Sequence, residues 1–203
     1  MNQHSDALNA QFHLDKILDE MQTQGFSVID GLYPLEYMQA LQQECSTHLD
    51  QFRKASIQDG VMTEIRSDHI LWIEPHFTLA SKHIEQLECL SQDFNRYFFA
   101  VIRDIEAHFA CYHAGEFYAL HRDNPQQKNG RVFSTVYYLH PEWHDDWQGQ
   151  LRLQDIQDQW HVIEPQPNRL VLFQSDLLHE VLETKQDRLS ITAWMRNSDP
   201  VLG

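Results

Sequence analysis

The chain has 203 residues, of which 42% are hydrophobic and 11% aromatic, and its formal net charge is −15 at pH 7. Such a length is typical of one domain, which we place at residues 1–203 with residues 1–11 as a flexible terminus. The acidic balance disfavours non-specific nucleic-acid binding, because that needs a basic surface. It is compatible with a protein partner that carries a basic patch.

The cysteines and the hydropathy pattern predict a cytoplasmic protein. The chain has an odd number of cysteines, and they are widely spaced: Cys45, Cys89 and Cys111. This is typical of proteins that keep their thiols reduced. The N-terminal residues lack the apolar segment of a signal peptide, and no stretch approaches the roughly 18 apolar residues of a membrane span. We therefore expect no membrane contact, and the sequence leaves the oligomeric state open.

Helical periodicity prevails in the first half of the chain. Gly25 is a natural end for the first helix, and Pro34 suits the first turn of the second. In chain order we predict a helix at Phe12–Gln24, a strand at Phe26–Asp30, a helix from Pro34 to Phe52, a mobile loop or hairpin tip at Arg53–Thr63, strands at Glu64–Arg66 and His69–Glu74, and two helices within Leu79–Glu106.

Short strand-like runs separated by turn residues replace this pattern after Glu106. They are Ala107–His113, Phe117–Leu120, Arg131–His140, Gln150–Leu153, Trp160–Glu164, Arg169–Gln174, Glu180–Glu183 and Arg188–Arg196. About eight such strands favour a double-stranded β-helix, the jelly roll, in the second half. The predicted fold class is therefore α+β, with the N-terminal helices buttressing one sheet.

The last of these runs has two distinct faces, because side chains alternate along a strand. The apolar face suits packing on helices, and the other face places an arginine and two hydroxyls inside the barrel. These faces are Leu189, Ile191, Ala193 and Met195 on the one side and Arg188, Ser190, Thr192 and Trp194 on the other. An unpaired buried charge is costly, so Arg188 needs an anionic partner, which is either a protein carboxylate or a ligand.

His121 and Asp123 lie two residues apart just after a strand-like run, where both side chains of an extended chain point to one face. An imidazole and a carboxylate are two of the three ligands of a 2-His-1-carboxylate iron site. About two such His-x-acid pairs arise by chance in a chain this rich in histidine and acidic residues. Context favours His121 and Asp123, because the other pairs fall in the N-terminus, a helix or a polar loop.

His179 is a suitable third ligand, and Arg188 follows nine residues later. A facial triad leaves three coordination positions open for substrates. An α-keto acid can fill two of these positions and oxygen the third. Arg188 can then hold the distal carboxylate of the keto acid in a charge-assisted pair, which explains the interior arginine.

The second half resembles the Fe(II)- and 2-oxoglutarate-dependent oxygenases, and among them the prolyl hydroxylases that modify the hypoxia-inducible factor and their bacterial relatives. The resemblance covers about Gly25 to Met195 and is carried by the ordered blocks EIRSDHILWIE, ACYHAGEFYALHRDNP, GRVFSTVYYLHPEW, GQLRL, IEPQPNRLVLF, SDLLHEV and DRLSITAW. It implies a dioxygenase that hydroxylates a prolyl residue of a protein substrate and releases succinate and CO2.

The resemblance also implies the roles of individual residues. His121, Asp123 and His179 are the iron ligands, and no catalytic residue is implied beyond this metal site. Arg188 and Tyr138 bind the distal carboxylate of 2-oxoglutarate, Thr192 lies beside it, and Tyr112 contacts the cosubstrate near the metal. Tyr118, Arg131 and Trp194 lie near the substrate entrance. Fe(II), 2-oxoglutarate and O2 are the implied cofactors, together with ascorbate binding.

Two departures from the family bear on these expectations. The segment Arg53–Thr63 occupies the place of the substrate-covering loop and differs greatly from the animal enzymes, so their hypoxia-factor substrate does not carry over. The family's paired glycine before the LRL-like strand is here Gln148-Gly149, which is expected to affect a turn and not the metal.

Two other functions stay open from the sequence. One is a 2-oxoglutarate oxygenase that acts on a free amino acid, a small molecule or alkylated nucleic acid. The acidic charge disfavours nucleic acid, and Arg196 is a poor match for the second arginine of such demethylases. The other is a non-catalytic β-sandwich that binds the metal as a sensor.

Overall fold

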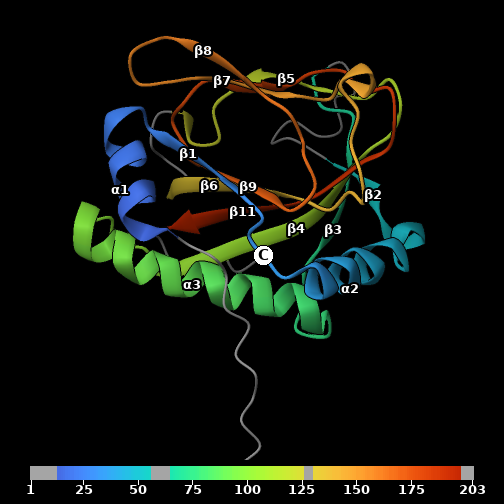
Figure 1. The fold of residues 1–203 in the computed structure, drawn as a ribbon, viewed down its shortest axis with the longest axis horizontal. Coiled ribbons are helices and arrows are strands. Elements are labelled where there is room, and N and C mark those ends of the chain that lie inside the picture. Colours follow the sequence, from blue (N-terminus) through green and yellow to red (C-terminus); the bar gives the residue numbers. More distant parts are fainter. Residues whose placement is uncertain (1–12, 56–64, 126–129, 198–203) are drawn as a thin grey trace, which may run out of the picture.

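The computed structural model describes residues 13–55, 65–125 and 130–197. Two antiparallel sheets face each other across a buried layer, and the helices cover the outer face of the larger sheet (Figure 1). The elements in order are α1 (Leu14–Thr23), β1 (Phe26–Asp30), α2 (Leu35–Ser46), η1 (Leu49–Gln51), β2 (Arg53–Lys54), β3 (His69–Trp72), α3 (Thr78–Phe98), β4 (Asp104–Tyr112), β5 (Tyr118–His121), β6 (Arg131–Tyr138), η3 (Asp145–Trp147), β7 (Leu151–Gln154), β8 (Trp160–Ile163), β9 (Arg169–Gln174), β10 (His179–Val181) and β11 (Arg188–Arg196).

The larger sheet has the strand order β1-β9-β6-β11-β4-β3-β2, and the smaller sheet has the order β5-β10-β7-β8. All eight strands predicted for the second half are present, and they divide evenly between the two sheets. The chain therefore crosses repeatedly from one sheet to the other, as a jelly roll requires. The predicted fold class is confirmed.

Alternating side chains give the larger sheet its two buried faces. On β4, Phe109 and Cys111 point to the helices, whereas Ala110 and Tyr112 point to the smaller sheet. The layer between the sheets is completed by apolar residues of both: Phe26, Val136, Tyr138, Leu151, Leu153, Ile163, Val171, Phe173, Leu177 and Val181. This layer fixes how the sheets lie relative to each other, because protein interiors are close-packed.

The helices pack on the outer face of the larger sheet through apolar stripes. Ile17 and Met21 of α1, Leu41 of α2, and Leu87 and Phe94 of α3 are completely buried. They share one hydrophobic core with the apolar face of β11, namely Ile191, Ala193 and Met195. The predicted buttressing of one sheet is thus present, and Figure 1 shows α3 running along the sheet with α1 and α2 near its two ends.

The prediction of two helices within Leu79–Glu106 is wrong. One helix, α3, runs from Thr78 to Phe98 and ends where Phe99 adopts a left-handed φ of 53°. The Asn95 side chain then accepts the Ile102 N–H at 2.6 Å and donates to the Ile102 carbonyl at 2.9 Å, which holds the turn. Ile105, whose spacing suggested a helix, lies in β4 opposite Met195.

Two smaller differences concern the first half. Pro34 precedes the first helical residue of α2 instead of occupying it, and this helix ends at Ser46, before the predicted Phe52. The strand predicted at Glu64–Arg66 is reduced, among the residues described, to one isolated bridge between Arg66 and Tyr118. Residues 1–12 and 56–64 lie outside the described part of the chain, so the predicted flexible terminus and most of the predicted loop at Arg53–Thr63 stay predictions.

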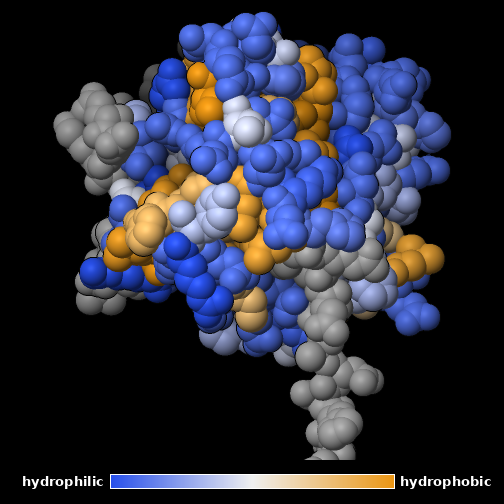
Figure 2. Space-filling view, turned by 60° about the vertical axis from the view of Figure 1, so that its left-hand side comes forward, coloured by the Kyte–Doolittle hydropathy of each residue, from blue (hydrophilic) through white to orange (hydrophobic). Residues whose placement is uncertain are grey.

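The surface agrees with an acidic, polar composition. Figure 2 looks toward the side where α1 and the C-terminal end of α3 lie, and it shows a mostly hydrophilic face with small hydrophobic groups. Tyr97 in the last turn of α3, and Phe99 and Val101 just after this helix, are among the exposed large hydrophobic residues. Within the described residues, no helix combines the length and hydrophobicity needed to cross a membrane.

Candidate metal centre

The three predicted metal ligands come together at the smaller sheet. His121 is the last residue of β5 and pairs directly with His179, the first residue of β10. Asp123 follows β5 by two residues. Its carboxylate oxygens lie 3.6 Å from His121 Nε2 and 3.6 Å from His179 Nε2. One ligand atom from each residue lies within 4.8 Å of the others, a spacing that suits a single metal ion.

Backbone carbonyls set the tautomers of both histidines. His121 Nδ1 lies 2.8 Å from the carbonyl of Ala119, and His179 Nδ1 lies 2.9 Å from the carbonyl of Leu177. Each Nδ1 therefore carries the proton and donates it, which leaves the Nε2 lone pairs directed toward Asp123. Metal-binding histidines are characteristically held in this way, with the second ring nitrogen donating to a carbonyl or carboxylate.

The electrostatics favour the protonation states of a metal site. Burial alone would raise the pKa of Asp123, but its neighbours His179 and His121 and the hydrogen bond donated by the Ser134 hydroxyl hold that pKa well below its usual range. The pKa of His179 is lowered to about 4, chiefly because the ring is buried and also because the His121 imidazole lies beside it. An ionised carboxylate and a neutral imidazole are the forms that bind a metal. The donor set thus fits Fe(II).

Arg188 lies across the cavity on β11 of the larger sheet and is 1% exposed. Its Nη2 donates to Tyr138 Oη at 3.3 Å, and its buried Nε has no hydrogen-bond partner. No carboxylate of the described residues forms an ion pair with it. A buried guanidinium without a protein anion is costly, so of the two partners expected from the sequence the ligand is favoured.

Two tyrosines enclose the Arg188 side chain. The guanidinium carbon lies 5.1 Å from the ring centre of Tyr112 and 4.9 Å from that of Tyr138. Burial raises the pKa of both phenols, so both stay protonated and can donate a hydrogen bond. Because Tyr138 accepts from Arg188, its own O–H is free to point at an anion beside the arginine. Thr192 lies on the same face of β11, where it also lines the cavity.

The turn at Gln148-Gly149 borders this arginine. Gly149 has φ +72°, and a Cβ there would lie 3.0 Å from Thr184 and 3.2 Å from Arg188 Cδ. Gln148 has φ 59°, a conformation that glycine adopts more readily. Gln148 thus takes up a glycine-like conformation without a glycine, while Gly149 keeps room for the arginine.

The cavity between the two sheets joins the metal ligands to Arg188. It is lined by Arg66, Tyr112, Tyr118, His121, Asp123, Val136, Leu151, Phe173, His179, Val181, Arg188, Thr192 and Trp194. The metal ligands, the predicted cosubstrate residues Tyr112, Arg188 and Thr192, and the predicted substrate residues Tyr118 and Trp194 therefore share one site. Tyr118 stacks on the His121 ring with centroids 3.6 Å apart.

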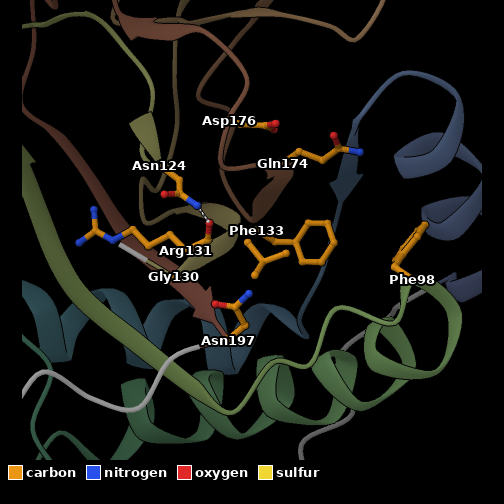
Figure 3. Close-up of a pocket in the computed structure, with 9 residues that line it drawn as sticks. Phe98, Asn124, Gly130, Arg131, Phe133, Gln174, Asp176 and Asn197 are labelled. Atoms are coloured by element: carbon orange, nitrogen blue, oxygen red, sulfur yellow. Dashed lines mark hydrogen bonds between the residues drawn. The ribbon is translucent and has the colours of Figure 1, made fainter. Parts of the chain in front are cut away.

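Arg131 lies beside this cavity instead of lining it. Its guanidinium stacks on Trp194, 3.6 Å from the ring centre, and pairs with Glu106 at 3.1 Å. Arg131 lines a second, larger pocket with Phe98, Asn124, Gly130, Val132, Phe133, Gln174, Asp176 and Asn197. Figure 3 shows this pocket and the hydrogen bond of 2.6 Å from Asn124 to the Arg131 carbonyl. The stacked Arg131 and Trp194 thus stand between the two pockets.

Sequence reasoning missed Arg66 and Asp68. Arg66 lines the cavity, forms a two-pronged ion pair with the fully buried Asp68 at 2.6 and 3.0 Å, and lies over the Tyr118 ring at 4.8 Å. The alternation of an arginine and an aspartate before the strand HILW was the signal available. Arg66, held by Asp68, thus packs on Tyr118 and adds to the wall of the site.

Acidification is expected to destabilise the metal-free protein, because four buried histidines stay neutral in the fold. Burial is the main cause in each case and lowers the pKa of His83 and His140 to about 3 and of His108 and His179 to about 4. The unfolded chain takes up these protons below its ordinary histidine pKa of about 6.5, so stability falls from there toward pH 4. Each group contributes up to about 1.4 kcal/mol per pH unit.

Urea unfolding at pH 7 and pH 5 measures this loss. His83 gives a clean control, since it lies on α3 against Tyr33 and away from the metal ligands. Replacing His83 by Gln should flatten the pH dependence by about one histidine's share. An unfolding free energy that is equal at both pH values would contradict the predicted neutral histidines.

Comparisons of the sequence and of the structure with known proteins point to the same family. Residues 107–196 match the family model described as the 2OG-Fe(II) oxygenase superfamily. A crystal structure of a Pseudomonas putida prolyl-4-hydroxylase is 31% identical, with a TM-score of 0.83 over 90% of this chain and 98% of that one. A Trichoplax adhaerens prolyl hydroxylase, solved with a peptide fragment of the hypoxia-inducible factor, is 28% identical with a TM-score of 0.83, over 90% and 88% of the two chains.

The curated relatives are longer proteins. The Caenorhabditis elegans hypoxia-inducible factor prolyl hydroxylase is 33% identical over 146 residues, which is 64% of this chain and 20% of that protein. The chain spans between 20% and 59% of the length of the four curated relatives it matches. The family that these similarities indicate is thus one whose description names Fe(II), in agreement with the candidate metal site of His121, Asp123 and His179.

Proposed function

Since the chain belongs to the 2OG-Fe(II) oxygenase superfamily and, within it, to the prolyl hydroxylases, we propose that it is a dioxygenase that hydroxylates a prolyl residue of a protein substrate. The observation that supports this most is the pairing of a His-Asp-His cluster with a buried arginine that lacks a protein anion, on the two sheets that enclose one cavity. A metal at one sheet and an anion-binding group on the other suit 2-oxoglutarate.

His121, Asp123 and His179 would hold Fe(II) at the smaller sheet. When bound, the iron supplies the activation of O2 together with the oxidative decarboxylation of 2-oxoglutarate to succinate and CO2. The protein holds these reactants in place and excludes competing reactions. Tautomer selection by the carbonyls of Ala119 and Leu177 keeps both Nε2 atoms available to the metal.

Arg188 would receive the distal carboxylate of 2-oxoglutarate. Its planar guanidinium can donate two parallel hydrogen bonds to a carboxylate, and the Tyr138 O–H can add a third. Thr192 lies further along the same face of β11, and Tyr112 packs against the arginine. The apolar residues Val136, Leu151 and Phe173 line the stretch between, where the methylene groups of the cosubstrate would lie.

The substrate would approach past Tyr118 and Trp194. The first lies against His121 and the second on the same face as Arg188 and Thr192, so both border the reacting centre. Arg131, stacked on Trp194, extends this border outward. A protein substrate fits the relatives, one of which was solved with a peptide of the hypoxia-inducible factor. Cytoplasmic location and ascorbate binding remain predictions of the sequence.

Incubation with Fe(II), 2-oxoglutarate and a library of capped peptides with a central proline tests the proposal. We expect succinate release that increases with particular peptides, and mass spectrometry should place one added oxygen atom on proline. Turnover with free amino acids or nucleotides alone would contradict the peptide substrate. Absence of succinate in every mixture would contradict the oxygenase itself, and binding of both Fe(II) and 2-oxoglutarate in that case would indicate a sensor.

A further inference from the structure

Three consecutive carbonyls in the turn after β9 accept hydrogen bonds from the region of the metal ligands. The Ser175 carbonyl accepts the Asn124 N–H at 2.9 Å, and the Asp176 carbonyl accepts the Arg122 guanidinium. The Leu177 carbonyl accepts His179 Nδ1 at 2.9 Å. Asn124 and Arg122 flank Asp123, and His179 is itself a predicted ligand. One short turn is therefore bonded to both sides of one ligand and to a second ligand directly.

Two buried hydroxyls connect the same turn to the Asp123 carboxylate. Ser134 Oγ lies 2.6 Å from Asp123 Oδ2 and 2.8 Å from Ser175 Oγ, and Ser134 and Ser175 are 0% and 1% exposed. An ionised carboxylate only accepts, so the Ser134 proton goes to Asp123. The remaining bond is then donated by Ser175 to Ser134. The hydrogens are thus ordered in one direction, from Ser175 through Ser134 to Asp123.

This chain of hydroxyls fixes the rotation of the carboxylate. Oδ2, which accepts from Ser134, is the oxygen that lies 3.6 Å from His179 Nε2, and Oδ1 lies 3.6 Å from His121 Nε2. Holding one oxygen in place leaves the other toward the second imidazole. Without the Ser134 bond, the carboxylate could turn about its Cβ–Cγ bond and lose this matched arrangement.

The turn Ser175–Leu177 is also hydrogen-bonded to the larger sheet. Ser134 lies within β6, and the Ser175 N–H donates to the Val132 carbonyl of the same strand at 3.0 Å. Asp123 follows β5 of the smaller sheet, yet its carboxylate is held from the larger one. Bonds that reach across the two layers restrict the ligand more than contacts along its own strand alone.

We propose that Ser134 and the turn Ser175–Leu177 are positioning residues that preset the metal ligands before the metal binds. The inference rests on the proposed metal site, and it assigns these serines no contact with substrate. Partners of this kind typically change metal affinity by about 10–100-fold when they are removed.

Titration of Mn(II) by calorimetry, without 2-oxoglutarate or substrate, tests the proposal. Ser134→Ala should weaken Mn(II) binding by about 10–100-fold, and Ser134→Thr, which keeps a hydroxyl, should restore most of the affinity. Ser175→Ala should cause a smaller loss. The double variant should bind about as weakly as Ser134→Ala alone, because the two serines act in series, whereas unrelated structural effects would add.

Thr135→Val is the matched control. Thr135 is the next residue of β6, is fully buried, and points its unpartnered hydroxyl to the opposite face of the strand. The Thr135→Val variant should therefore bind Mn(II) with unchanged affinity. Affinity of Ser134→Ala within about twofold of the original protein would overturn the proposal, as would an equal loss in Thr135→Val. If the original protein binds no Mn(II) or Fe(II), the proposed function fails instead. If Ser134→Ala does not fold, Ser175→Ala and Ser134→Thr decide the question.

Discussion

Replacing Asp123 by Ala is expected to reduce Fe(II) binding and the accompanying succinate release to background. The change removes the anionic ligand and leaves two imidazoles, each already committed to a backbone carbonyl through Nδ1. The loss should exceed the 10–100-fold that removing an outer partner of a metal ligand causes. Calorimetric titration of Mn(II) and a succinate assay without peptide measure the two effects separately.

Asp155→Ala provides the matched control for this experiment. Asp155 is also a buried carboxylate bonded to an imidazole, His161, at 2.7 Å, but it belongs to the turn between β7 and β8. Its loss should cost stability without changing metal affinity in the folded protein. Succinate release that persists in Asp123→Ala would overturn the ligand assignment, whatever happens at Asp155.

Replacing Arg188 by Met is expected to weaken 2-oxoglutarate binding by roughly 30-fold to several thousand-fold, because truncating one partner of a buried charge pair costs about 2–5 kcal/mol. The stability of the ligand-free protein should not fall and is expected to rise, since the change removes a buried charge that lacks a protein anion. Titration with 2-oxoglutarate and thermal unfolding of the ligand-free protein give these opposite results.

Arg169→Met separates a ligand-binding arginine from a structural one. Arg169 forms an ion pair with Asp30 across β9 and β1, so its replacement should lower stability somewhat and leave 2-oxoglutarate affinity unchanged. Arg188→Lys keeps the charge but loses the planar pair of donors. Its affinity for 2-oxoglutarate should therefore lie between that of the original protein and that of Arg188→Met. Equal losses of metal and cosubstrate affinity in Arg188→Met would indicate a structural role for this arginine.

Alternation along strands made the second half of the chain predictable. β9 and β11 begin and end at the predicted residues, and the two faces of β11 are those expected from Arg188 and its neighbours. The local hydrophobic pattern was insufficient to place the end of α3, where a helical spacing of apolar residues runs into a strand. The apolar residues after Phe98 continue a helical spacing, but a left-handed Phe99 and the Asn95 bonds to Ile102 turn the chain into β4. The pairing of β4 with β11, which places Ile105 opposite Met195, is a tertiary contact that local spacing does not report.

The candidate metal ligands could be predicted because two residue types, His and Asp, at three definite places carry the chemistry of metal binding. The residues that hold them could not. Ser134 is an ordinary small polar residue of β6 and Ser175 is another in the turn after β9, and the hydrogen bond between them joins positions 41 residues apart. The same applies to Arg66, which is held by Asp68 and contacts Tyr118 only because the two segments lie side by side. Sequence spacing reports what a residue can bind, whereas long-range packing decides what holds it.

The division of the site between the two sheets has a consequence for the choice of cosubstrate. Every predicted metal ligand lies at the smaller sheet, and Arg188 lies on the larger one. A keto acid bound to the metal at one end and to Arg188 at the other would connect the two sheets. The close-packed layer between the sheets sets the distance between these two anchoring points. An acid one methylene shorter or longer would leave one anchor misplaced. If 2-oxoglutarate binds as proposed, selection among keto acids by chain length would therefore depend on how the two sheets pack against each other through their shared core.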